Sequence, residues 1–248
     1  MGKEPAGMNH RIVFVAGSSG MVGMQLLHQL FQHPEVDWVV SFGRRELALK
    51  HQKLVQVKVN FDRLDQVDVV DEVRKQNRGG DFQSLLVALE RGDDRPLVFC
   101  SLGTTIRQAG SKDDFYRIDH DYVISFARMS LRYGAKRFAY VSAIGADAQS
   151  SIFYNKVKGT VEDDLRRMDF EYLGLFQPSL LLGDRKENRL GEEVGKVLMR
   201  AVTFLGLFKK YKPIYDHQVA RAMVKKMLNS QTTGNETITS LEMHKMTK

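Results

Sequence analysis

Tyr154 and Lys158 have the side-chain types and the spacing of an acid–base pair. Residues four apart lie on one face of a helix, so the lysine ammonium is expected beside the tyrosine hydroxyl. A phenol ordinarily has a pKa of about 10, and a neighbouring positive charge favours the phenolate and lowers that pKa. We therefore predict that Tyr154 exchanges a proton with a substrate oxygen. A surface Tyr–Lys pair is the alternative, because this spacing is common by chance.

A glycine-rich segment near the start of the chain has the pattern of a dinucleotide-binding loop. Glycines allow a tight turn and let backbone amides approach a pyrophosphate, while the N-terminus of the following helix favours negative charge. A turn that binds nothing is the alternative, but the apolar run before it and the helical pattern after it favour a dinucleotide. The predicted cofactor contacts are Gly17, Ser18, Ser19, Gly20, Met21, Val22 and Gly23.

Two arginines, Arg44 and Arg45, follow the second expected strand. An NAD-specific site usually has Asp or Glu there, which accepts hydrogen bonds from the ribose 2′-hydroxyl. Guanidinium groups instead hold a 2′-phosphate through charge-assisted, forked hydrogen bonds. We therefore predict NADP(H) rather than NAD(H) as the cofactor. Solvated loop charges are the alternative interpretation.

Other residues follow strands at the same edge of the expected sheet, where ligands bind in open α/β folds. Asp62 follows the third strand and is expected to accept a hydrogen bond from the adenine amino group, with a helix N-terminal carboxylate as an equal alternative. Leu102, Gly103 and Thr104 follow the fourth strand and are expected against the cofactor, although a simple turn explains Gly103 nearly as well. Ser142 follows the fifth strand and is expected to orient a substrate carbonyl, which completes a predicted catalytic triad with Tyr154 and Lys158.

The elements that must position these residues alternate between strands and helices. Apolar runs typical of buried strands occupy residues 11–16, 37–42, 54–61, 95–102, 137–142 and 172–182. Helical patterns occupy residues 21–31, 115–133, 153–167 and 215–227, and two more helices are expected between residues 67 and 91. This alternation predicts an α/β fold, a Rossmann-type doubly wound parallel sheet. We predict that residues 1–184 form the NAD(P)-binding domain and that residues 185–248 are a small helical extension of the same domain.

Seven segments together resemble the short-chain dehydrogenase/reductase superfamily, and in particular its small NAD(P)H-binding oxidoreductases related to the Tat-interacting-protein homologues. They are VFVAGSSGMVG, SFGRREL, CSLGTTIRQAG, FYRIDHDYV, YVSAIGAD, FYNKVKGTVEDDL and FQPSLLLGDR. The resemblance implies a Rossmann-type fold, NADP(H) at the glycine loop and Arg44, and catalysis by Ser142, Tyr154 and Lys158. It also implies that Tyr154 and Lys158 contact the cofactor, with Lys158 on the nicotinamide ribose and Pro178 beside the nicotinamide. Many members have Arg where this chain has Gln177.

The composition is that of a folded soluble protein, with 248 residues of which 43% are hydrophobic and 27% charged. These values exclude a largely disordered or collagen-like chain. One cysteine excludes an intrachain disulfide framework and any multi-cysteine metal site. The seven histidines lack metal-binding spacing, so no metal is expected, and His120 and His217 are expected at the surface or at helix ends.

The net charge of +7 comes from the last quarter of the chain, where residues 185–248 contain 13 Lys+Arg and 6 Asp+Glu. A basic amphipathic helix is expected over residues 192–212. It is expected to cover the substrate pocket or a subunit contact, and weak contact with an anionic membrane stays open. We expect no nucleic-acid partner, a homodimer as an open alternative, and a cytoplasmic location, because neither a secretory signal nor a membrane-spanning run is found.

The function that these observations favour is an NADP(H)-dependent oxidoreductase of the carbonyl reductase or alcohol dehydrogenase type. Its partner is then a small carbonyl or alcohol substrate. One alternative is an NADPH-binding regulatory or redox-sensing protein, which needs the glycine loop but not Tyr154 and Lys158. A second is an epimerase or dehydratase of nucleotide sugars, which generally needs a larger substrate region than residues 183–248.

Overall fold

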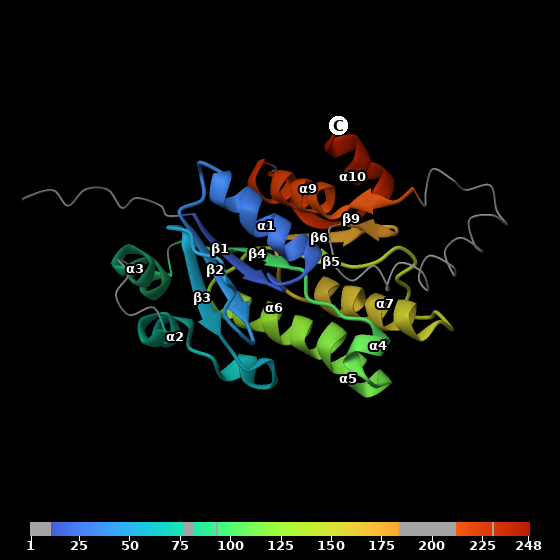
Figure 1. The fold of residues 1–248 in the computed structure, drawn as a ribbon, viewed down its shortest axis with the longest axis horizontal. Coiled ribbons are helices and arrows are strands. Elements are labelled where there is room, and N and C mark those ends of the chain that lie inside the picture. Colours follow the sequence, from blue (N-terminus) through green and yellow to red (C-terminus); the bar gives the residue numbers. More distant parts are fainter. Residues whose placement is uncertain (1–10, 77–81, 93, 184–211, 230) are drawn as a thin grey trace, which may run out of the picture.

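A seven-stranded parallel sheet forms the centre of the molecule in a computed structural model that describes residues 11–76, 82–92, 94–183, 212–229 and 231–248 (Figure 1). The strand order is β3-β2-β1-β4-β5-β6-β9. The strands are β1 (Ile12–Ala16), β2 (Trp38–Gly43), β3 (Leu54–Lys58), β4 (Leu97–Cys100), β5 (Arg137–Val141), β6 (Tyr172–Gln177) and β9 (Gly234–Thr239). A separate pair joins β7 (Leu181–Leu182) to β8 (Ile214–Tyr215). The expected Rossmann-type α/β fold is confirmed.

The sheet winds outward in both directions from β1, which pairs with β2 on one side and with β4 on the other. In a doubly wound sheet the ligand crevice lies where this order reverses, outside the carboxyl ends of the strands. The loops after β1, β2 and β4 meet at this edge, and they carry the residues that the sequence predicted around a cofactor.

Helices cover both faces of the sheet (Figure 1). On one face lie α1 (Met21–Gln32) and α9 (Asp216–Asn229), and on the other lie α6 (Tyr122–Arg132) and α7 (Phe153–Arg166). All five residues of β1 are buried and alternate between two cores. The remaining helical segments are η1 (Phe61–Gln66), α2 (Val69–Gln76), α3 (Gln83–Arg91), α4 (Ile106–Ala109), α5 (Lys112–Tyr116), η2 (Arg117–Asp121) and α10 (Ser240–Met246).

The long helix expected over residues 115–133 is confirmed, because α5, η2 and α6 follow one another without a break, and it also contains the π-helical turn η2, which the sequence did not predict. This turn places Asp119 and His120 in the interior, where they are 0% and 9% exposed. His120 was expected at the surface or at a helix end, and it lies in the last turn of η2 with a buried ring. Its two ring nitrogens lie 2.8 Å from Asp121 and 2.9 Å from Asp164. His217 is exposed, as expected.

The C-terminal part of the chain contributes to the central sheet, which the sequence did not predict. Strand β9 pairs in parallel with β6, and a capping box between Thr239 and Glu242 starts α10 immediately after it. The strand reads GNETIT and has a single buried residue, so it lacks the apolar run of an interior strand. The sixth predicted strand is correspondingly shorter and ends at Gln177.

The expected basic helix over residues 192–212 lies, apart from Lys212, outside the described residues. Its expected roles as a lid, a subunit contact or a membrane contact stay predictions. Among the helices that the structure describes, none has the length and apolar character needed to cross a membrane.

Candidate cofactor and catalytic site

A cleft of about 810 Å³ lies at the carboxyl edge of the sheet, where the order of the strands reverses. It is lined by three groups of predicted cofactor contacts: Gly17, Ser18, Ser19 and Gly20 after β1, Arg44 and Arg45 after β2, and Leu102, Gly103 and Thr104 after β4. Met21, Val22 and Gly23 belong to the first turn of α1 and do not line the cleft. The topology therefore brings these three predicted loops together around one space.

Two glycines, Gly17 and Gly23, lie where the backbone leaves no room for a side chain. Gly17 has a φ of +86°, and a Cβ there would lie 2.5 Å from the Ser101 carbonyl carbon and oxygen. A Cβ on Gly23 would lie 2.1 Å from the Gly17 carbonyl oxygen, so this glycine lets α1 pack against the loop. Gly20 caps α1 without a side-chain hydrogen bond, and the first turn carries no acidic residue. The N-terminal amides of α1 are thus left for an anion, which fits a pyrophosphate.

The arginines after β2 give one end of the cleft a positive charge. Arg44 and Arg45 are exposed and line the cleft together with Lys58 and Arg117. Two acidic residues also line it, but Asp114 is bound by Ser111 and Arg117. A phosphate that enters this end meets more cations than anions, as the sequence argument for a 2′-phosphate requires.

Asp62 lies in the first turn of η1 and accepts a hydrogen bond from the Tyr122 hydroxyl, with an O···O distance of 2.8 Å. It does not line the cleft, whereas Phe61 and Tyr122 do. Their rings lie 5.3 Å apart and form an aromatic wall that the sequence analysis missed. The contact of Asp62 with an adenine amino group stays a prediction.

Lys158 lies behind the cleft and is 3% exposed. Its Nζ is 2.8 Å from Oδ1 of the fully buried Asp119 and donates a hydrogen bond to the Tyr140 hydroxyl at 2.9 Å. The other carboxylate oxygen of Asp119 accepts a hydrogen bond from the Thr104 backbone amide at 2.7 Å. A Cβ on Gly103 would lie 3.5 Å from Lys158 Nζ, so the lysine lies next to a residue that lines the cleft. The sequence analysis identified neither Asp119 nor Tyr140.

Tyr154 lies one helical turn before Lys158 on α7, is partly buried, and has its ring centroid 5.7 Å from that of Phe115. The expectation of a lowered tyrosine pKa is wrong. Burial, together with the Asp119 carboxylate, raises the pKa of Tyr154 more than the Lys158 ammonium lowers it. Burial alone would lower the pKa of Lys158, but Asp119 and the two phenols raise it well above its usual value. The pair is therefore a neutral phenol beside an ammonium whose charge Asp119 balances.

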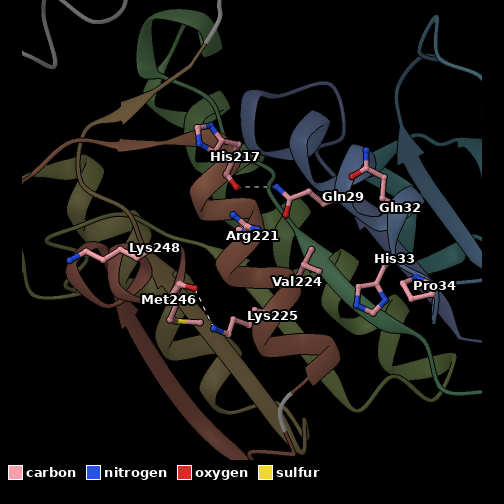
Figure 2. Close-up of a pocket in the computed structure, with 10 residues that line it drawn as sticks. All are labelled: Gln29, Gln32, His33, Pro34, His217, Arg221, Val224, Lys225, Met246 and Lys248. Atoms are coloured by element: carbon pink, nitrogen blue, oxygen red, sulfur yellow. Dashed lines mark hydrogen bonds between the residues drawn. The ribbon is translucent and has the colours of Figure 1, made fainter.

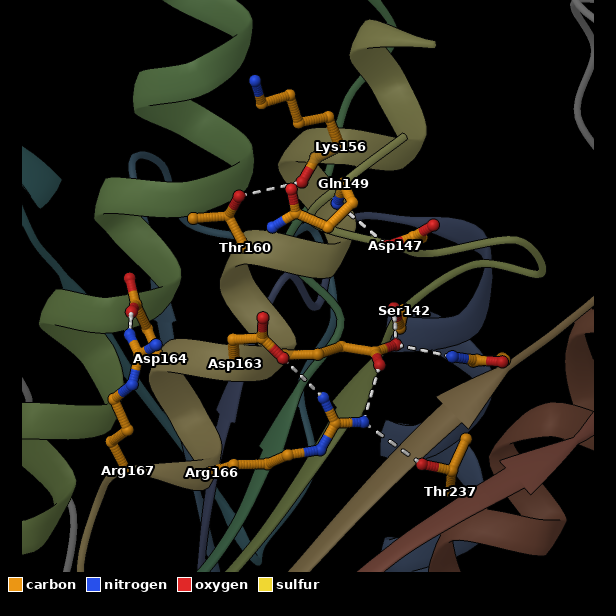
Figure 3. Close-up of polar contacts among 12 residues, drawn as sticks. Ser142, Asp147, Gln149, Lys156, Thr160, Asp163, Asp164, Arg166, Arg167 and Thr237 are labelled. Carbon is orange, nitrogen blue, oxygen red and sulfur yellow. Dashed lines mark hydrogen bonds and ion pairs between the residues drawn. The ribbon is translucent and has the colours of Figure 1, made fainter. Parts of the chain in front are cut away.

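Ser142 follows β5 and is 4% exposed. Its hydroxyl donates a hydrogen bond of 2.5 Å to the carboxylate of Glu162, which also accepts from the Gln177 amide at 2.9 Å. Arg166 binds the second oxygen of Glu162 at 3.0 Å and reaches Thr237 on β9 (Figure 3). The single hydroxyl proton of Ser142 is thus committed to a buried carboxylate. Its predicted contact with a substrate carbonyl stays a prediction, as does the contact of the nearby Pro178 with nicotinamide.

A second cleft lies between α1, α9 and the end of α10, on the face of the sheet that α1 and α9 cover (Figure 2). Its lining includes the basic residues Arg221, Lys225 and Lys248 and the imidazoles of His33 and His217. None of the predicted catalytic or cofactor residues is among the described residues that line it. The predicted cofactor loops therefore line the cleft at the carboxyl edge of the sheet and not this second cleft.

Comparison with known proteins decides the family. No family model matches the chain. Protein HTATIP2 of Rattus norvegicus is 35% identical over 193 residues, which cover 77% of this chain and 71% of the relative. The chain belongs to the HTATIP2 and FMP52 family. FMP52-1 of Scheffersomyces stipitis is 29% identical over 231 residues, covering 91% of this chain and 92% of the relative, and fmp52-1 of Aspergillus terreus is 32% identical over 71% and 69%.

The resemblance to the Tat-interacting-protein homologues that the sequence indicated is confirmed. Solved structures share the fold of this chain at low identity. WbmH of Bordetella bronchiseptica, solved with NAD⁺, has a TM-score of 0.63 and 16% identity over 93% of this chain and 76% of its own. UDP-glucose 4-epimerase of Thermotoga maritima, solved with UDP-glucose, has a TM-score of 0.60 and 13% identity over 92% and 76%. Identities this low establish the shared fold alone.

The family comparison corrects the expected location. Six relatives of the FMP52 group carry the designation mitochondrial in their names, which contradicts a cytoplasmic assignment. The expectation rested on the lack of a secretory signal and of a spanning apolar run. Neither feature distinguishes the cytoplasm from compartments that proteins reach by other routes.

Proposed function

We propose that the protein is an NADP(H)-dependent oxidoreductase that interconverts a small carbonyl compound and its alcohol. The observation that carries the proposal is the position of Lys158, buried behind Gly103 of the cofactor cleft and one helical turn from Tyr154. A glycine loop without a catalytic pair would serve a binding protein equally well. A phenol beside a buried ammonium, by contrast, can donate a proton to a substrate oxygen and has a charge nearby that stabilises the phenolate left behind.

NADP(H) fits the residues that line the cleft. The cradle of Gly17 and Gly20 and the uncapped start of α1 would hold the pyrophosphate, and Arg44 and Arg45 would hold the 2′-phosphate. Gly103 and Thr104 would lie against the nicotinamide half, with Lys158 behind them. When bound, the cofactor supplies or accepts the hydride.

Tyr154 supplies the proton. Because its pKa is raised, the hydroxyl is protonated at neutral pH and acts as a general acid toward a carbonyl oxygen. Reduction then adds one hydride to the carbonyl carbon and one proton from Tyr154 to the oxygen, which leaves a phenolate beside the Lys158 ammonium. That charge stabilises the phenolate until solvent returns the proton.

The preference for NADP(H) is tested by comparing how far NADPH and NADH raise the melting temperature of the protein. The proposal predicts a larger rise with NADPH, and predicts that Arg44→Ala combined with Arg45→Ala removes the difference. Equal rises with both cofactors in the wild type would refute the phosphate assignment.

A nucleotide-sugar epimerase or dehydratase is the second candidate. The fold similarity to UDP-glucose 4-epimerase, which covers 92% of this chain, favours it. The discriminating measurement incubates the protein with NAD⁺ and UDP-glucose and follows sugar epimerisation, in parallel with NADPH oxidation by a panel of aldehydes and ketones. Our proposal predicts turnover in the second assay only.

A further inference from the structure

Tyr140 is a buried phenol that the proposed reaction does not yet use. It lies within β5, is fully buried, and belongs to the core beneath α6 and α7. A buried tyrosine needs a polar partner for its hydroxyl, and here Lys158 fills that role with an Nζ···O distance of 2.9 Å. The hydroxyl of Tyr140 therefore reaches from the sheet to the lysine of the proposed catalytic pair.

The hydrogen-bond donors of Lys158 can be counted. A lysine ammonium has three N–H groups and no acceptor. One faces the Asp119 carboxylate at 2.8 Å, and a second is donated to Tyr140 at 2.9 Å. No other hydrogen bond of Lys158 is found among the described residues, so one N–H remains. Gly103 lies next to Nζ on the side of the cleft.

Asp119 and Tyr140 hold Lys158 from different elements. Asp119 comes from the π-helical turn η2, and its second oxygen is fixed by the Thr104 amide of the cofactor loop. Tyr140 comes from the centre of the sheet. The ion pair with Asp119 and the hydrogen bond to Tyr140 thus fix Lys158 Nζ from two elements, and together they define the direction of its third N–H.

We propose that Tyr140 is a positioning residue that directs the remaining N–H of Lys158 toward the nicotinamide-ribose half of the cofactor. The inference rests on the proposed function, because it requires NADP(H) in the cleft. Tyr140 then strengthens the binding of the nicotinamide-ribose half of the cofactor only. The adenine and 2′-phosphate half would meet the glycine loop and the arginines, with which Tyr140 makes no hydrogen bond among the described residues.

The test compares two ligands in Tyr140→Phe. NADPH carries both halves, whereas 2′,5′-ADP carries only the adenine and 2′-phosphate half. The variant keeps the aromatic ring and the charge of Lys158 but removes the acceptor. We expect the Kd of NADPH to rise about tenfold, as for the loss of one well-directed hydrogen bond to a charged group. We expect the Kd of 2′,5′-ADP to stay at its wild-type value, which also shows that the variant is folded.

Tyr172→Phe is the matched control. Tyr172 is also buried in the sheet and donates its hydroxyl to a charged group, Glu236, at 2.9 Å, but it starts β6 at the end opposite the cofactor. The control should bind both ligands like the wild type. Unchanged NADPH binding in Tyr140→Phe, or equal weakening of both ligands, would overturn the role of Tyr140 while leaving the proposed function in place. A wild-type protein that binds neither ligand would overturn both.

Discussion

At the scale of single residues, the site is organised around charge balance within the interior. Asp119 and Lys158 form an ion pair that is almost entirely removed from water. Burial raises the pKa of Tyr154, the Lys158 ammonium lowers it, and the Asp119 carboxylate offsets part of the effect of the ammonium, so the phenol stays protonated. The residues therefore favour proton donation by Tyr154, which is the step that carbonyl reduction requires.

Replacing Tyr154 with Phe should reduce the rate of carbonyl reduction by a factor of about 10² to 10⁴, the usual contribution of a positioned acid. Binding of NADPH should change little. In the wild type, reduction should show no loss of rate attributable to Tyr154 until the pH passes about 10, because a raised pKa keeps the acid form present below that point. Steady-state rates across pH measure both effects. Full turnover by the variant would exclude Tyr154 as the acid.

Asp119→Asn should lower the pH at which deprotonation of Tyr154 begins to reduce the rate of carbonyl reduction. Asp119 raises the pKa of both Tyr154 and Lys158, so its removal lowers both. Breaking a buried ion pair from one side should also destabilise the fold by about 3–5 kcal/mol, which urea unfolding measures. Asp121→Asn is the control, since it changes an exposed carboxylate of the same turn. An unchanged pH profile in Asp119→Asn would contradict the charge-balance account.

At the scale of elements, the glycine loop and the start of α1 are joined by close backbone contact. Gly23→Ala would place a Cβ 2.1 Å from the Gly17 carbonyl oxygen, so α1 must shift. We expect a loss of stability of about 1–3 kcal/mol together with weaker NADPH binding. In Gly20→Ala the new Cβ would lie 3.2 Å from the same oxygen, and a smaller loss is expected. Thermal melts compare the two, and equal melting temperatures would count against the packing role of Gly23.

Helix α7 is attached to the sheet by Glu162. Its carboxylate binds Ser142 after β5 and Gln177 at the end of β6, and it is 2% exposed. Glu162→Ala should destabilise the protein by about 1–3 kcal/mol for each buried donor that it leaves without an acceptor, and the donors concerned are Ser142 and Gln177.

Asp163→Ala is the control for this attachment. It removes an exposed carboxylate from the same Arg166 and should cost at most about 1 kcal/mol. Chemical unfolding measures both variants, and similar losses would show that the buried network does not anchor α7.

At the scale of the whole molecule, the sequence predicted the parallel sheet and the edge at which the cofactor cleft lies. Apolar runs indicated the strands of the sheet, and the glycines and polar residues that follow those runs indicated the edge with the cleft. The sequence did not predict β9, because the edge strand GNETIT is polar and has no apolar run. Asp119 was missed because a lone carboxylate within a helical pattern reads as solvent-exposed, and only the π-helical turn carries it inward. The pKa of Tyr154 was misjudged because the sequence showed the ammonium but neither the burial of the phenol, which is the largest cause of the raised pKa, nor the Asp119 carboxylate.

The central claim is hydride transfer from NADPH with proton donation by Tyr154. Its most direct measurement uses NADPH deuterated at the transferring position of the nicotinamide, a panel of aldehydes and ketones, and mass spectrometry of the products. The account predicts that the wild type forms an alcohol carrying one deuterium on the carbinol carbon, and that Tyr154→Phe forms it far more slowly while still binding NADPH. A protein that binds NADPH yet transfers no deuterium to any member of the panel would contradict the account.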